Sequence, residues 1–246
     1  MDEKSLHNNV GARLSAPALG DGRSPGEKST CNPKLRIGVL ALQGDFEAHL
    51  KALSQAASKL GVEIETRAVK LPHNLEGLDG IIIPGGESTT IGKLMVEYGL
   101  QEGLRQKIRA GLPVWGTCAG LILLAKETDN ALAGQPLLAS MDICVRRNAF
   151  GSQRESFETD LSVPVLGEAP FHTFFIRGPA IESAGPEVEV LATLDDGTIV
   201  AVREGPLIGT AFHPEVSGDP RFHYYFLRIV QSVKAGAMDD TTGTIR

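Results

Sequence analysis

A candidate nucleophile, Cys118, lies in the segment VWGTCAGLILLA at residues 114–125. A strand-like apolar run ends in a turn with glycine at positions 116 and 120, and a helix-like apolar run follows. A helix that begins at such a turn lowers the pKa of a thiol from about 8.5, because its free N–H groups favour the thiolate. The N–H of Ala119 is then a natural oxyanion donor. On its own, the motif favours a cysteine in a hydrophobic core, which is also our interpretation of Cys144.

A candidate base and its orienting carboxylate lie in the segment TAFHPEV, as His213 and Glu215. Residues two apart in an extended segment project to the same side. The carboxylate can therefore fix the tautomer of the imidazole while the other ring nitrogen faces a thiol. Here the histidine precedes the acid, whereas hydrolases with a nucleophile elbow place the acid first. Without a partner cysteine, this spacing is more typical of a solvated loop.

A third candidate segment, IIIPGGESTTIGKL at residues 81–94, contains a glycine pair at the end of a strand-like run. Five residues separate Gly86 from Gly92, where a phosphate-binding loop has four, and Leu94 replaces the required Ser or Thr. These departures exclude a nucleotide site of that type. Gly85 and Gly86 instead let the backbone approach a small substrate and offer N–H groups to an oxyanion.

The elements that would position these residues alternate between strand and helix. Strand-like runs are expected within residues 35–42, 62–69, 80–86 and 112–116, and helices within 45–61, 88–111 and 219–236. Asp45 is placed as an N-cap, Gly61 as a terminator and Gly99 as an interruption. The alternation predicts an α/β fold with three layers: a mostly parallel, twisted, flavodoxin-like sheet with helices on both faces. Sites in such sheets lie beyond the carboxyl ends of the strands.

The second half of the chain is predicted to be rich in strands. The expected strands lie within residues 142–150, 157–163, 171–178, 188–194, 198–205 and 207–215. We expect one domain over residues 35–236. The polar segment 1–34 is predicted to be a disordered extension and 237–246 a flexible tail. The extension lacks the apolar region of a secretory signal, and its acidic residues argue against a transit peptide, although its arginines keep that alternative open.

Composition excludes several classes of protein. The chain has 246 residues, 42% hydrophobic and 22% charged, which is ordinary for a globular protein. A net charge of −6 argues against a nucleic-acid binder, and no apolar run approaches the ~18 residues of a membrane span. The three cysteines, Cys31, Cys118 and Cys144, form no CxxC pair. We therefore expect neither a disulfide framework nor a structural metal site, and a reducing, cytoplasmic location.

Six segments together resemble the class I glutamine amidotransferases, and within them the glutaminase subunits of pyridoxal 5′-phosphate synthases. They are GVLALQGDFEAH, PGGESTT, GTCAGLILLAKE, RNAFGSQRESFE, FIRGP and FHPE. The resemblance extends from about residue 35 to the end of the last predicted helix. The chain departs from it in the N-terminal extension, in Ser152 where many members have arginine, and in Gly178 where alanine is common.

The resemblance implies hydrolysis of L-glutamine to L-glutamate and ammonia, without a cofactor or metal. The ammonia passes to a synthase subunit that makes pyridoxal 5′-phosphate, in a heteromeric complex. Cys118 attacks the side-chain amide, His213 transfers the proton and Glu215 orients the imidazole. The backbone at Gly86 and Ala119 stabilises the oxyanion.

The resemblance also implies a set of glutamine-binding residues. They are Gly86, Glu87, Ser88, Arg147, Ile176 and Arg177. A zwitterionic substrate needs an anion near its ammonium and a cation near its carboxylate, which agrees with this set. The alternative for the two arginines is an ion-pair or surface role. His49, His172 and His223 are predicted to be structural, since no metal-ligand spacing appears among them.

Three other functions remain open at this point. One is a glutaminase for another amidotransferase, such as the imidazole glycerol phosphate synthase type, against which RNAFGSQ and GTCAG speak. Another is a different cysteine hydrolase or peptidase of similar architecture. The third is an interaction module without catalysis, which the complete Cys–His–Glu set argues against.

Overall fold

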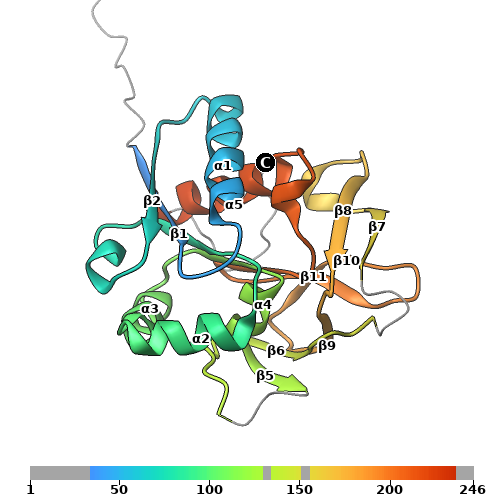
Figure 1. Ribbon diagram of the computed structural model, residues 1–246. Helices are drawn as coiled ribbons and strands as arrows, with labels where there is room; N and C mark the ends of the chain where they lie inside the picture. The colour runs from blue at the N-terminus through green and yellow to red at the C-terminus, as the bar shows by residue number, and fades with distance from the viewer. Residues whose placement is uncertain (1–33, 130–133, 151–155, 237–246) are drawn as a thin grey trace, which may run out of the picture. The chain divides into compact units, whose positions relative to one another are not determined.

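Parallel strands form the first half of the main sheet in the computed structural model, which describes residues 34–129, 134–150 and 156–236 (Figure 1). In spatial order they are β2 (Ile64–Val69), β1 (Leu35–Leu40), β3 (Gly80–Ile83), β4 (Val114–Thr117) and β12 (Leu207–Thr210). Each neighbouring pair is parallel. The carboxyl ends of these strands therefore meet at one edge, where the predicted nucleophile, base and glycine pair all follow a strand.

The helices begin and end close to where their capping residues predict. They are α1 (Phe46–Leu60), α2 (Ser88–Glu97), α3 (Leu100–Arg109), α4 (Ala119–Leu124) and α5 (Arg221–Lys234). Asp45 caps α1 by accepting from the backbone N–H of Ala48 at 3.1 Å, and Gly61 ends the helix at φ 62°. Gly99, at φ 70°, separates α2 from α3. All three predictions are confirmed. Short 3-10 helices occupy Pro72–Leu75 (η1), Pro164–Leu166 (η3) and Pro214–Val216 (η4).

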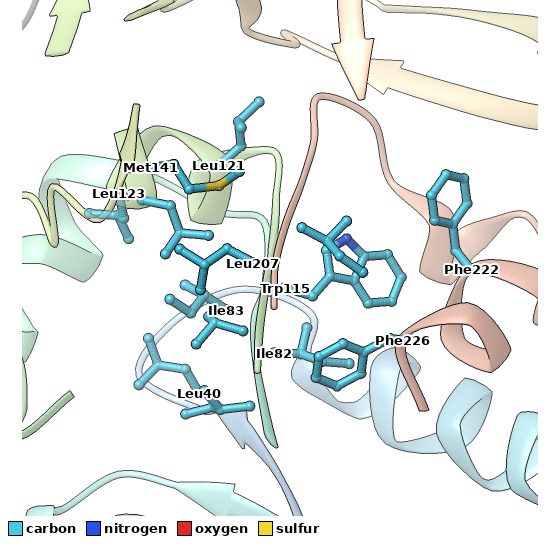
Figure 2. Packing of buried hydrophobic residues seen from close by; sticks show 14 of the residues in the cluster. Leu40, Ile82, Ile83, Trp115, Leu121, Leu123, Met141, Leu207, Phe222 and Phe226 are labelled. Carbon is cyan, nitrogen blue, oxygen red and sulfur yellow. The ribbon is translucent and has the colours of Figure 1, made fainter. Parts of the chain in front are cut away.

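The sheet separates two hydrophobic layers. Trp115 of β4 stacks on Phe222 of α5, whereas the neighbouring Gly116 faces α4. Figure 2 shows the same alternation in β3, where Ile82 lies on the side of Phe226 and Ile83 on the opposite side. α1 and α5 contact each other on one face, and α2 contacts α3 and α4 on the other (Figure 1). The predicted three-layer α/β fold is confirmed.

The second half of the sheet is mixed in direction. Beyond β12 it continues with β11 (Ile199–Glu204), β9 (Ala180–Ala184), β6 (Met141–Arg146) and β5 (Ala125–Asp129), while β10 (Glu189–Thr193) pairs with β11. β7 (Ser156–Leu161) and β8 (Phe171–Ile176) form a separate antiparallel pair. The sequence prediction lacked β5 and β9. Both pair with β6, and their short segments, AKETD and AIESA, lack the apolar alternation of a half-buried strand.

Several sequence predictions concern residues outside the described ranges. They include the extension up to residue 33, the tail from residue 237, Cys31 and Ser152. The domain boundaries remain a prediction. Within the described residues, every helix is too short or too polar to span a bilayer.

Candidate active site

Cys118 lies on a strained turn between β4 and α4. Its backbone has φ 47° and ψ −101°, a conformation that L-residues rarely adopt, and its N–H donates to the carbonyl of Thr210 at 2.8 Å. A Cβ on Gly116 would lie 2.5 Å from the carbonyl of Gly120, and a Cβ on Gly120 would overlap the carbonyl oxygen of Ile83. Only glycine at both positions lets α4 approach the strands closely.

His213 lies next to the thiol at the carboxyl end of β12. Its ring borders the same space as the Cys118 side chain, and its backbone N–H donates to the carbonyl of Phe174 in β8 at 2.9 Å. A Cβ on Gly85 would overlap the His213 ring and lie 3.4 Å from the Cβ of Cys118. Gly85 therefore leaves the space in which the imidazole and the thiol meet.

Glu215 forms a hydrogen bond with the ring of His213. Its Oε1 lies 2.8 Å from His213 Nδ1, and its side chain is 2% exposed. Burial by itself lowers the pKa of His213, but hydrogen bonds with Cys118 and Glu215 outweigh it and raise that pKa to about 10. Burial likewise raises the pKa of Glu215, and the hydrogen bond from His213 outweighs it, so the pKa is lowered. The site thus favours the imidazolium that forms when a base takes the thiol proton.

A second cluster joins three of the predicted glutamine-binding residues. Arg147 Nη2 donates to Glu87 Oε1 at 3.1 Å, and its Nη1 donates to Gln135 Oε1 at 3.0 Å. Gln135 Nε2 in turn donates to Ser88 Oγ at 3.1 Å. The sequence interpretation missed Gln135, which belongs to no motif. The cluster fixes the guanidinium of Arg147 near the start of α2.

Glu87 caps helix α2 with the same carboxylate. It accepts from the backbone N–H groups of Thr89 at 3.1 Å and Thr90 at 2.7 Å, and from the Thr90 hydroxyl at 2.7 Å. Burial opposes ionisation, but these hydrogen bonds together outweigh it and lower the pKa of Glu87 to about 2. Glu87 is therefore an anion across the physiological pH range, placed beside Arg147.

The glycine loop after β3 is held by a residue from the neighbouring strand end. Glu87 donates its backbone N–H to Gln43 Oε1 at 2.8 Å, and a Cβ on Gly86 would overlap that oxygen. Gly86 has φ 149°, where a side chain would be strained. The sequence interpretation missed Gln43 as a site residue. Its signal was its position three residues after the end of β1, at the same edge of the sheet.

Ile176 and Arg177 lie at the end of β8, and the side chains of both are exposed. Ile176 is 45% exposed, and Arg177 has φ 47°. Strand β8 reaches the triad through the bond between Phe174 and His213. A Cβ on Gly178 would lie 3.2 Å from the carbonyl of Ala211, so an alanine there requires its neighbours to move by a few tenths of an ångström.

The remaining histidines divide between surface and interior. His172 is exposed and pairs with Asp160 at 2.7 Å and Glu158 at 3.3 Å, across the β7–β8 hairpin. His49 and His223 are buried. Among the residues that the structure describes, no group of three or more His, Cys, Asp or Glu side chains is arranged to hold a metal ion.

Comparison with known proteins identifies the family of this chain. Residues 39–232 match the SNO glutamine amidotransferase family. The chain is 56% identical over 194 residues to "Pyridoxal 5′-phosphate synthase subunit PdxT" of Herpetosiphon aurantiacus, covering 78% of this chain and 99% of the relative. It is 54% identical over 196 residues to the protein of the same name from Moorella thermoacetica, covering 80% and 100%.

Solved structures support the same assignment. A structure described as "Crystal structure of glutamine amidotransferase" matches with a TM-score of 0.69 and 47% identity, covering 79% of this chain and 98% of that one. A Thermoplasma acidophilum protein described as a GMP synthase component, 19% identical with a TM-score of 0.54, shares the fold and covers 82% and 96%. The resemblance inferred from the six sequence segments is confirmed. The chain belongs to the SNO glutamine amidotransferase family.

Proposed function

We propose that this chain is the glutaminase subunit of a pyridoxal 5′-phosphate synthase. It hydrolyses L-glutamine to L-glutamate and ammonia in the cytoplasm and passes the ammonia to a synthase subunit in a heteromeric complex. The observation that carries the proposal is the cluster of Cys118, His213 and Glu215 at the carboxyl edge of the sheet. Glu215 Oε1 lies 2.8 Å from His213 Nδ1, and Gly85 borders both the imidazole and Cys118. Relatives named as subunits of that synthase are more than half identical to this chain.

The first half-reaction makes a thioester. His213 takes the thiol proton, and Cys118 Sγ attacks the side-chain amide carbon of glutamine. The oxyanion that forms is stabilised by the backbone N–H groups of Ala119 and Gly86. His213 then gives its proton to the amide nitrogen, the C–N bond breaks and ammonia leaves. Glu215 holds the imidazole throughout and stabilises its cationic form.

The second half-reaction restores the enzyme. A water molecule gives a proton to His213 and attacks the thioester carbon, and the C–S bond breaks. Glutamate leaves and releases the proton of its new carboxyl group to water, and the Cys118 thiolate remains beside the protonated His213. Throughout, Arg147 attracts the α-carboxylate and Glu87 the α-ammonium, while Ser88, Ile176 and Arg177 line the remainder of the site.

The synthase subunit is proposed to control this reaction as well as to receive its product. Ammonia released into water is lost, so hydrolysis without an acceptor wastes glutamine. The peptide between Gly85 and Gly86 can turn at low steric cost, which would move an N–H group into or out of the oxyanion site. A missing oxyanion donor lowers turnover about a hundredfold or more. We therefore expect the chain alone to be a poor glutaminase.

The test is steady-state glutamine hydrolysis by the purified chain, alone and titrated with the synthase subunit. We expect turnover to rise about a hundredfold with the partner and to vanish in Cys118→Ala. The glutamine analogue 6-diazo-5-oxo-norleucine should label Cys118, and Cys144→Ala should retain full turnover. Turnover that Cys118→Ala leaves intact would contradict the proposed nucleophile. Full turnover without the partner would contradict only its control of the site.

A further inference from the structure

Two buried histidines lie behind the carboxylate of the proposed triad. His49 of α1 and His223 of α5 are both fully buried, and His49 Nδ1 lies 3.0 Å from His223 Nε2. Both rings also contact Trp115 edge-on, with centroids 5.8 Å and 4.8 Å away. The pair forms a polar connection between two helices within an otherwise apolar layer.

The other side of His49 faces the active site. Its Nε2 lies 3.4 Å from Glu215 Oε2 and 3.3 Å from the hydroxyl oxygen of Thr117, the residue before Cys118. Oε2 is buried and has no well-aligned hydrogen-bond partner in the described part of the chain. Burying a carboxylate oxygen without a hydrogen-bond donor costs free energy. A donor at the His49 nitrogen that faces Oε2 would reduce this cost. Hydrogen bonds of catalytic groups are often long before substrate binds.

The ring protons of the pair can be assigned by counting. Burial lowers the pKa of His49 and of His223 to about 3, so both rings are neutral and each carries one N–H. If the proton of His49 is on its Nδ1, the lone pair of its Nε2 faces the Glu215 carboxylate. The proton of His223 then lies on the Nδ1 of His223, a buried atom without a hydrogen-bond partner in the described part of the chain. If the proton of His49 is on its Nε2, that N–H lies between the Thr117 hydroxyl oxygen at 3.3 Å and Glu215 Oε2 at 3.4 Å, and His223 donates its Nε2–H to His49 Nδ1. The second arrangement leaves only an acceptor, His223 Nδ1, unsatisfied.

We propose that His49 is a positioning residue for glutamine hydrolysis, donating its Nε2–H to Glu215 Oε2, and that His223 fixes the tautomer in which it can do so. The inference rests on the proposed function and departs from the structural role expected for both histidines. With Oε2 held, the carboxylate keeps Oε1 directed at His213 Nδ1, and His213 keeps its Nε2 directed at Cys118. Both histidines are fully buried, so we expect their substitution to change kcat rather than KM.

The test uses matched variants of the full chain in complex with the synthase subunit. The amide nitrogen of Gln can occupy the place of a histidine Nε2, whereas Leu offers no donor. We expect His49→Leu to lower kcat on the order of tenfold to a hundredfold with unchanged KM, as outer-shell partners of functional groups do. His49→Gln should recover most of that loss. The rate at which 6-diazo-5-oxo-norleucine labels Cys118 should follow kcat.

Controls separate this role from simple packing. Phe226→Leu alters a side chain of α5 that also packs on Trp115, so it should lower the melting temperature while leaving kcat unchanged. His223→Leu should lower kcat severalfold and His223→Gln should restore it, and this pair decides the question if His49→Leu does not fold. Native kcat in a folded His49→Leu, or equal losses in the Leu and Gln variants, would overturn the inference. A native complex that hydrolyses no glutamine would instead overturn the proposed function.

Discussion

Two histidine environments lie on opposite sides of one carboxylate, that of Glu215. On the solvent side, His213 is 13% exposed and its pKa is raised to about 10. On the interior side, His49 is fully buried and its pKa is lowered to about 3. Burial lowers the pKa in both environments, but only His213 has hydrogen bonds strong enough to reverse that effect. The comparison shows that partners, rather than depth, decide which imidazole holds a second proton.

The difference suits the two positions. In the proposed reaction, the imidazole beside the thiol gains and loses a proton, so stabilisation of its cation assists the step in which it acts as a base. The imidazole behind Glu215 has to keep one tautomer, and neutrality ensures that. As proposed, Glu215 Oε1 contacts the imidazole that gains and loses a proton, and Oε2 faces the imidazole that keeps its proton.

The largest expected effect comes from removing the solvent-side partners one at a time. His213→Ala should lower kcat about ten-thousandfold, since it removes the group that transfers the proton. Glu215→Gln should cost less, about a hundredfold, because the imidazole remains but is poorly oriented. His172→Ala, an exposed histidine in ion pairs, is the matched control and should retain native kcat. Small, equal effects of the first two variants would mean that FHPE is only a loop.

A smaller effect is expected in the titration of the two environments. In the native chain, NMR of the imidazole rings should show His213 protonated up to about pH 10 and His49 neutral above about pH 3. Cys118→Ala removes one hydrogen bond to His213 and should lower its pKa, leaving that of His49 unaltered. A His213 pKa near 6.5 in both proteins would contradict the raised pKa assigned to His213.

The same titration has a consequence for stability. A folded-state pKa raised from 6.5 means that the contribution of His213 to the free energy of unfolding is complete below pH 6.5 and disappears as the pH rises to about 10. The decline over this range should be shallower in Cys118→Ala. Denaturant unfolding of both proteins at several pH values measures it, and parallel curves would contradict the assigned cause.

The smallest effect should appear when neither histidine environment is touched. Arg147→Ala removes a cation that pairs with Glu87 and, as proposed, attracts the substrate carboxylate. We expect KM for glutamine to rise about tenfold with little change in kcat, as for loss of one charge-assisted hydrogen bond. Arg147→Lys should give an intermediate value. A fall in kcat with unchanged KM would place Arg147 with the catalytic groups instead.

Local features were predictable because each depends on near neighbours in sequence. The cap at Asp45 and the terminator at Gly61 act within about one turn of chain. The spacing of His213 and Glu215 predicted their contact for the same reason. The parallel order of the strands then followed from their alternation with helices.

Non-local pairing escaped prediction. His49 and His223 are 174 residues apart and meet only because α1 and α5 pack on the same face of the sheet. Gln135 lies 47 residues from Ser88, and β5 and β9 exist through their pairing with β6 rather than through their own composition. A single sequence gives the type of each residue, whereas these contacts depend on the completed fold.

At Cys118, selection for stability and selection for turnover act in opposite directions. A side chain held at φ 47° and ψ −101° costs on the order of 1–3 kcal/mol, and only turnover gives a reason to keep it. Cys118→Gly should therefore be more stable than Cys118→Ala, although we expect both variants to be inactive. In a lineage that no longer needed the hydrolysis, substitution by glycine at this position would be favoured, because it relieves the backbone strain. The identity of residue 118 in a distant homologue is therefore a record of whether ammonia release is still under selection.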